Sequence, residues 1–158
     1  MTGFRTCTVA ALAVTLLLPT AALAGLGSDK TMYLGGTVAG VKEKTEGKSS
    51  TTDPKVFSFA AKKAKFDIPY DQINSLEYGQ KAGRRIGVAV VVNPLFIFSK
   101  KRKHFLTIGW TDADGQQQAA VFELGKDVIR VQLATLEARS GRKIEYQDEE
   151  ARKSGAGN

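Results

Sequence analysis

The chain has 158 residues and a formal net charge of +7, with 23 lysine and arginine residues against 16 aspartate and glutamate residues. This length is typical of one domain with a sizeable core. The single cysteine is Cys7, near the N-terminus. The rest of the chain therefore excludes a disulfide, a thiolate metal site and a cysteine nucleophile.

The first 24 residues have the pattern of a secretory signal peptide. Arg5 supplies the positive charge, and the apolar stretch Val9–Leu18 is shorter than the roughly 20 residues of a membrane span. Residues 22–24 match a small-x-small cleavage site. We expect an exported, periplasmic or extracellular protein beginning at Gly25; an uncleaved anchor is the alternative. Removing 24 of 158 residues leaves 134 and a net charge of +6.

The next segments predict a strand between flexible stretches. Gly25–Lys30 is a short flexible lead, and Thr31–Val41 contains a strand. Within it, the pair 35–36 (GG) indicates a bulge or a close backbone approach. Lys42–Pro54 is polar and rich in turn residues, so we expect an exposed loop there.

Alternating hydrophobicity predicts three further strands before residue 80. Val56–Tyr70 contains two of them, joined by the basic stretch Lys62–Lys65. Ile73–Tyr78 is a third, short strand. Tyr70 and Tyr78 are expected to pack near a corner of the sheet.

A hairpin follows the basic region near residue 100. In Phe105–Thr111 the larger apolar side chains Leu106, Ile108 and Trp110 alternate, so we expect them to face one side. Residues 112–115 (DADG) form its turn, with the glycine supplying positive φ. Gln116–Leu124 is the return strand.

One helix is predicted near the C-terminus, over Asp127–Ser140. Asp127 is placed to cap it, and Gly141 to end it. An apolar stripe at helical spacing indicates one buried face. The stripe comprises Val128, Ile129, Leu133 and Leu136.

The remaining segments complete a mainly β domain of six to seven strands in antiparallel hairpins. Ile144–Tyr146 adds a short extended piece, and Gln147–Asn158 is a charged tail expected to be frayed and disordered. A curved sheet or open barrel has an end that needs covering. The single amphipathic helix is suited to this position.

Two stretches carry a family resemblance. Phe66–Gln80 (FDIPYDQINSLEYGQ) resembles a strand and corner of bacterial PH/GRAM-like domains, and Lys100–Gly141 resembles their late hairpin and C-terminal helix. The chain is thus similar to uncharacterised exported bacterial proteins with a PH/GRAM-like domain, here spanning residues 31–146. The resemblance implies a PH-like fold and a binding or scaffold role. The family's lipid-headgroup motif is not carried over, because Glu43 and Glu46 interrupt its basic residues.

The apolar segment Ile86–Phe98 lies between two basic clusters. It is too short for a membrane-spanning helix, and Asn93-Pro94 interrupts it. Two strands, Ile86–Val92 and Leu95–Phe98, fit its β-branched composition. Three interpretations remain open: core strands, a hairpin dipping into a membrane, or a surface that docks a partner.

Catalysis has little support among the remaining side chains. His104 is the one histidine and has no companions in a triad or metal-site pattern. Asp112 and Asp114 are explained by the hairpin turn, and Trp110 by the core. We therefore expect a protein that is not an enzyme and has no cofactor.

Two functions follow from this inventory. The first is peripheral association with an anionic membrane through the segment and its basic flanks. The second is a protein- or peptide-interaction module in which the segment is core. The expected partner is anionic lipid or an envelope protein, without nucleic acid. The candidate binding residues are Lys81, Arg84, Arg85, Val90, Val91, Leu95, Phe96, Lys100, Lys101, Arg102 and Lys103.

Overall fold

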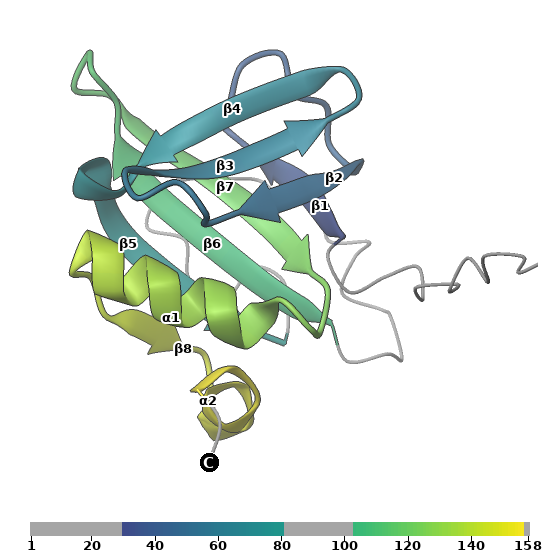
Figure 1. Cartoon of the computed structure of the whole chain (residues 1–158), viewed down its shortest axis with the longest axis vertical. Helices are drawn as coiled ribbons and strands as arrows, with labels where there is room; N and C mark the ends of the chain where they lie inside the picture. Colours follow the sequence, from purple (N-terminus) through teal and green to yellow (C-terminus); the bar gives the residue numbers. More distant parts are fainter. Residues whose placement is uncertain (1–29, 81–102, 157–158) are drawn as a thin grey trace, which may run out of the picture.

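A computed structural model describes residues 30–80 and 103–156. This part of the chain is mainly β, with one open eight-stranded mixed sheet and two C-terminal helices (Figure 1). The strand order is β4-β3-β2-β1-β7-β6-β5-β8. The predicted signal peptide, the lead up to residue 29 and the predicted strands within 86–98 lie outside the described residues.

Four antiparallel strands form the first half of the sheet. They are β1 (Thr31–Gly36), β2 (Thr45–Ser50), β3 (Val56–Ala61) and β4 (Ala64–Pro69). The predicted bulge is confirmed, because the register of β1 against β7 shifts between Tyr33 and Gly35. The predicted close approach is also confirmed. A Cβ at Gly36 would lie 2.9 Å from the Ala120 Cα.

The exposed loop predicted over Lys42–Pro54 is wrong in its centre, which forms β2. The side chains of β2 that face inward are small and polar, so no apolar alternation marks the strand. Gly47 packs so closely on Phe59 that a Cβ there would lie 2.7 Å from its ring. The buried Gln132, in the first of the two C-terminal helices, donates a hydrogen bond from its Nε2 to Oγ of Ser49 at 2.6 Å. Tertiary contacts therefore stabilise this strand.

The second half of the sheet contains β5 (Ile73–Gly79), β6 (His104–Thr111), β7 (Gln117–Leu124) and the short β8 (Ile144–Tyr146). A short 3₁₀ helix, η1 (Tyr70–Gln72), precedes β5. The β6–β7 hairpin turns where predicted, and Gly115 has φ 76°. β8 pairs with β5 in parallel, so the expectation of purely antiparallel pairing is wrong.

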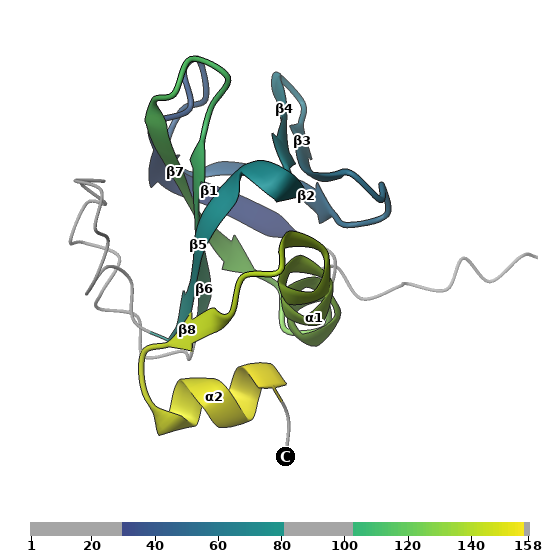
Figure 2. The same ribbon diagram turned by 90° about the vertical axis from the view of Figure 1, so that its left-hand side faces the viewer.

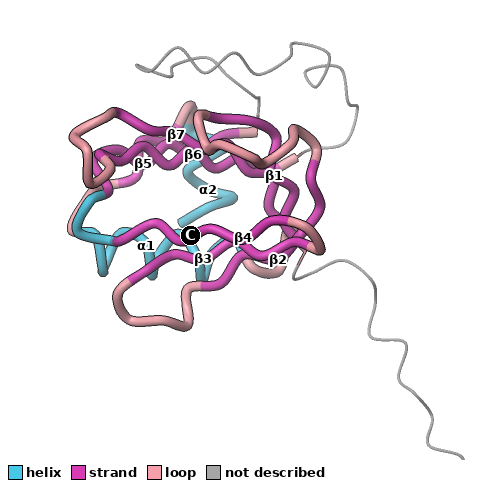
Figure 3. Tube along the Cα trace, turned by 90° about the horizontal axis from the view of Figure 1, so that it is seen from above, coloured by secondary structure: helices cyan, strands magenta, loops and turns pink. Residues whose placement is uncertain are grey.

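The core lies between the two halves of the sheet. Figure 3 shows β5, β6 and β7 on one side and β2, β3 and β4 on the other. The Phe122 ring lies between them, with centroids 5.4 Å from Phe57, 5.6 Å from Phe59 and 5.9 Å from Tyr33. These separations suit edge-to-face aromatic packing.

Helix α1 (Ile129–Ser140) covers the open side of this core (Figure 2). Ile129, Leu133 and Leu136 are buried, which confirms the stripe, and the helix ends at Gly141 with φ 69° as predicted. The predicted Asp127 cap is wrong. Val128 occupies the N-cap position, and no side chain caps the helix there.

A second helix, α2 (Glu149–Ala156), occupies most of the segment expected to be a frayed tail. Asp148 caps it, with its Oδ1 accepting a hydrogen bond from the Ala151 amide at 2.7 Å. Ala151 is fully buried, and a Cβ at Gly155 would lie 2.9 Å from the Tyr78 ring. Close packing of these small residues holds α2 on the domain. Such residues form no apolar stripe, so the sequence pattern does not predict this helix.

The expectation of a mainly β fold is thus confirmed, while its details differ. The described residues form eight strands instead of six to seven, and two C-terminal helices instead of one. Within residues 30–80 and 103–156, neither helix has the length and hydrophobicity needed to cross a bilayer.

Candidate interface at the end of β5 and β6

The basic and apolar region leaves and rejoins the sheet at one place. Gly79, the last residue of β5, pairs with Phe105 near the start of β6. The intervening residues 81–102 lie outside the described part of the chain, and they include all the candidate binding residues except Lys103. Both basic clusters are therefore attached at the same end of the β5–β6 pair.

Lys103 is held in an ion pair. Its Nζ lies 2.9 Å from Oε2 of Glu123 on β7, and the two side chains are 30% and 24% exposed. Glu123 pairs with Phe105 in the β6–β7 register, so Lys103 crosses to the neighbouring strand. Partly exposed pairs of this kind contribute about 1 kcal/mol or less. The pair offsets one of the cluster's charges and fixes where the chain enters β6.

His104 packs beside Tyr78 on the core side of the same strands. The two rings are stacked, with centroids 6.1 Å apart, and Nδ1 of His104 lies 2.6 Å from the Tyr78 hydroxyl. That hydroxyl also lies 3.1 Å from Oγ of Ser154 in α2. Burial lowers the pKa of His104, although the charge of Glu123 partly opposes this shift. The contacts give His104 a structural role that joins β5, β6 and α2.

Burial also raises the pKa of the Tyr78 phenol above its ordinary value, with the Ser154 hydrogen bond acting in the opposite direction. Tyr78 therefore stays protonated at neutral pH. Its hydroxyl serves as a hydrogen-bonding group between His104 and α2.

Trp110 and Asp112 occupy the places expected for structural roles. Trp110 is 8% exposed and belongs to the core. Asp112 closes the hairpin, because its Oδ1 accepts hydrogen bonds from the amides of Asp114 at 3.0 Å and Gln116 at 2.8 Å. The bond from the Gln116 amide, a further bond from Nε2 of Gln118 to Oδ2 at 2.7 Å, and the bond from the Asp114 amide together lower the pKa of Asp112.

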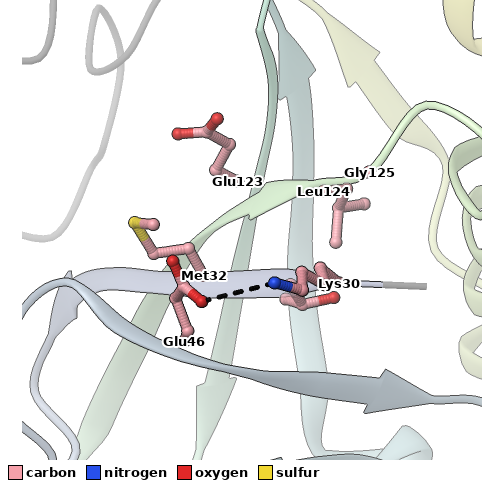
Figure 4. A pocket seen from close by; sticks show the side chains of 7 residues that line it. Lys30, Met32, Glu46, Glu123, Leu124 and Gly125 are labelled. Carbon is pink, nitrogen blue, oxygen red and sulfur yellow. Dashed lines mark ion pairs between the residues drawn. The ribbon is translucent and has the colours of Figure 1, made fainter. Parts of the chain in front are cut away.

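A shallow pocket of about 170 Å³ lies where the start of β1 meets β2 and β7 (Figure 4). Met32 stands in its wall between two carboxylates, Glu46 and Glu123, with which it pairs in the sheet. Lys30 lies 3.7 Å from Glu46, and Glu123 binds Lys103. Both carboxylates are thus balanced by cations. Across the described residues, no three His, Asp or Glu side chains gather as metal ligands.

A second basic area lies at the turn between β3 and β4. Lys62, Lys63 and Lys65 are exposed there. Their sequence predicts a basic connection between two strands and no binding role. The pairing of Lys65 with Ala60 sets a lysine beside a small residue of β3, which leaves its cation accessible. The clustering of three lysines within four residues is the signal that could have marked this area.

Comparison of the chain with models of known protein families found no match, and comparison with curated protein sequences found none either.

Proposed function

We propose that the protein is an exported, non-enzymatic binding domain that attaches to anionic membrane surfaces through its two basic clusters. A PH-like architecture is part of this proposal. It is supported by the position of β1, which pairs with both β2 and β7, and by helix α1, which follows β7 and covers the core.

The observation that carries the proposal is the pairing of Gly79 with Phe105. It attaches residues 81–85 and 100–103 to one end of the sheet. Together they contain seven cationic side chains. A Lys or Arg near an anionic leaflet contributes about 1 kcal/mol, so cations gathered at one end act on one surface. The pairing of Lys103 with Glu123 offsets one of these seven charges.

The contacts of His104 and Asp112 with neighbouring parts of the domain support the proposal that the protein is not an enzyme. His104 is packed on Tyr78, and Asp112 is occupied by backbone amides of its own turn. A general base or a nucleophile needs a position from which it can reach a substrate atom. Both side chains instead hold together neighbouring parts of the domain.

A protein-interaction module is the second candidate function. The observation in its favour is the position of β4 at one end of the strand order, where it pairs with β3. An extended peptide adds to such an edge through backbone hydrogen bonds. Exposed Lys65 and Asp67 alternate along β4, and charges of this kind disfavour non-specific edge pairing.

Charge-matched variants test the membrane proposal. The first replaces Lys100, Lys101 and Arg102 with glutamine, and the control replaces Lys62, Lys63 and Lys65 with glutamine. Each variant removes three positive charges. The affinity of the mature protein for anionic phospholipid vesicles, measured by co-sedimentation, should fall by about a hundredfold in the first variant, since each cation contributes about 1 kcal/mol. The control should lose much less.

Both variants should melt within a few degrees of the wild type, because the proposal assigns the replaced cations to the surface, where substitutions have small effects on stability. Equal losses in the two variants would contradict the proposal and indicate attraction by net charge alone. A wild-type protein that fails to sediment with anionic vesicles at low salt would also contradict it and favour the interaction module.

A further inference from the structure

The sheet carries apolar side chains on the face opposite its core. We call this the outer face. On β6 and β7 the residues alternate, so Leu106 and Phe122 enter the core while Phe105 and Val121 point the other way. Phe105 is 5% exposed and Val121 is 1% exposed, and neither belongs to the core cluster.

Two more buried residues belong with them. Ala119 lies two positions before Val121 on β7, and Leu34 lies at the β1 bulge beside the Gly35–Val121 pair. Each has 0% exposure, and both are absent from the core cluster. We define the outer patch as Leu34, Phe105, Ala119 and Val121.

Described side chains border this patch. A Cβ at Gly79, which pairs with Phe105, would meet Gln147. One at Gly35, which pairs with Val121, would meet Glu43. Figure 2 shows helix α1 and strands β2, β3 and β4 on one side of β5, β6 and β7, with helix α2 below β8. That side is the core side, because α1 packs Leu133 and Leu136 into the core cluster. Apolar side chains on an uncovered sheet face keep substantial contact with water. Beyond these bordering side chains, none of the helices and strands in residues 30–80 and 103–156 lies over the outer patch, so a layer from elsewhere would complete its cover.

We propose that the outer patch is an internal docking surface and that its occupant is the apolar segment Ile86–Phe98 of the same chain. The segment is apolar at almost every position and rich in β-branched residues, which favour packing against a pleated surface. The placement concerns the interior of the domain, and it holds whether or not the cations bind a membrane.

The lengths of the connections fit this placement. Five residues, 81–85, separate the segment from Gln80, and five more, 99–103, separate it from His104. Five extended residues span about 16 Å, whereas neighbouring strands are about 4.8 Å apart. Each connection is therefore long enough to return the segment over β6 and β7.

The ion pair of Lys103 directs the chain toward the outer face. Glu123 alternates with the core residues Phe122 and Leu124, so it lies on the same face as Val121. Its bond with Lys103, at 2.9 Å, holds the last residue of the second connection over that face. Glu77, on β5, lies on the same face, because it alternates with the core residues Leu76 and Tyr78. It accepts a hydrogen bond from Gln147 at 3.2 Å.

Single-cysteine labelling tests the placement in the full mature chain, which has no cysteine of its own. Cysteine is introduced at Val90, Val91, Leu95 or Phe96, with exposed Ala60 on β3 as the control site. Adjacent residues in a strand face opposite sides. At least one site of the pair Val90 and Val91, and at least one of the pair Leu95 and Phe96, should therefore react with a maleimide about tenfold more slowly than Ala60→Cys. The reason is that a buried cysteine reacts only when the structure opens locally.

A second substitution locates the docking face. Phe105→Ala removes part of the outer patch and should increase the labelling rate of the protected cysteine severalfold. Leu133→Ala weakens the core on the other face and should leave that rate nearly unchanged under conditions where the domain stays folded. Labelling at all four sites as fast as at Ala60→Cys would overturn the proposal. Protection that appears only at high protein concentration would also overturn it and assign the patch to a second copy.

Discussion

Gly36 shows how a single residue determines the pairing of two strands. Its φ is 154°, and a side chain there would collide with the carbonyl oxygen of Ala119 and approach the Ala120 Cα to 2.9 Å. Both are backbone groups of β7, which cannot rotate away. The absence of a side chain at Gly36 therefore allows β1 to approach β7 closely.

Gly36→Ala should lower the free energy of unfolding by about 2 kcal/mol or more, through overpacking and backbone strain. Gly40→Ala is the matched control, because Gly40 also has positive φ, 78°, but a Cβ at this position would have no atom within 4 Å. The Gly40→Ala substitution should lower the free energy of unfolding by only about 1 kcal/mol. Equal losses in urea denaturation would show that contact with β7 contributes nothing.

The pH dependence of stability tests the environment of His104. Burial lowers the pKa of His104, so the unfolded chain binds the proton at higher pH than the folded protein. The contribution of His104 to the free energy of unfolding should be fully present above the ordinary histidine pKa of about 6.5. It should be lost progressively as the pH falls from there toward the lowered pKa of the folded protein. Below the folded pKa no further loss arises from this group.

The measurement compares wild type with His104→Asn by urea denaturation at several pH values. Carboxylates titrate in both proteins, so the difference between them isolates the histidine. The loss of stability on acidification should be smaller in the variant. Parallel curves for the two proteins over the whole range would contradict the assigned environment.

Helix α1 illustrates stabilisation at the scale of an element. Leu133 is 1% exposed and packs against the core, whereas Val131 on the same helix is 66% exposed. Leu133→Ala should lower the free energy of unfolding by about 2–5 kcal/mol through lost transfer energy and a cavity. Val131→Ala should change it by about 0.5 kcal/mol or less. A wild-type melting temperature for Leu133→Ala would exclude the described packing.

Helix α2 should be part of the folding unit. A chain that ends at Gln147 loses the buried Ala151 and the contacts of Gly155 and Ser154 with Tyr78. Its free energy of unfolding should fall by about 2 kcal/mol, which is typical of the loss of a few buried contacts. A chain that ends at Ala156 serves as the control. Identical melting of the two truncated chains would mean that α2 adds no stability.

The predictability of these elements from sequence depends on whether a local signal exists. Alternation and glycine mark the β6–β7 hairpin, the β1 bulge and the end of α1, and the predictions for these three features are confirmed. Strand β2 and helix α2 escape prediction. Their contacts are made by Gly47, Ser49, Ala151 and Gly155, and such small residues give no hydrophobic period. Both elements form because distant parts of the chain pack on them.

The candidate site shows the same division. Charge and hydropathy alone identify the basic clusters and the apolar segment, and Lys103 is the member that the structure describes. Its partner Glu123 lies 20 residues away, and their contact depends on the register of β6 against β7. The outer patch also depends on that register, because only the alternation of core and non-core residues assigns Phe105 and Val121 to the outer face.

At the scale of the whole molecule, the two proposals combine into one arrangement. Under these proposals the apolar segment packs on the outer face of the sheet, and the cations that flank it are available to an anionic surface. Attachment would then be electrostatic, and such attachment is screened by salt because the Debye length falls from about 10 Å at 0.1 M to about 3 Å at 1 M. An inserted apolar hairpin would retain binding that salt does not screen.

The decisive test of this arrangement is the salt dependence with which the wild-type mature protein sediments with phospholipid vesicles. We expect binding to anionic vesicles at low salt, release as the salt approaches about 1 M, and no binding to zwitterionic vesicles. Failure to bind anionic vesicles at low salt, or equally strong binding to zwitterionic ones, would contradict the membrane proposal. Binding that persists at high salt would instead contradict the docking of Ile86–Phe98 on the sheet.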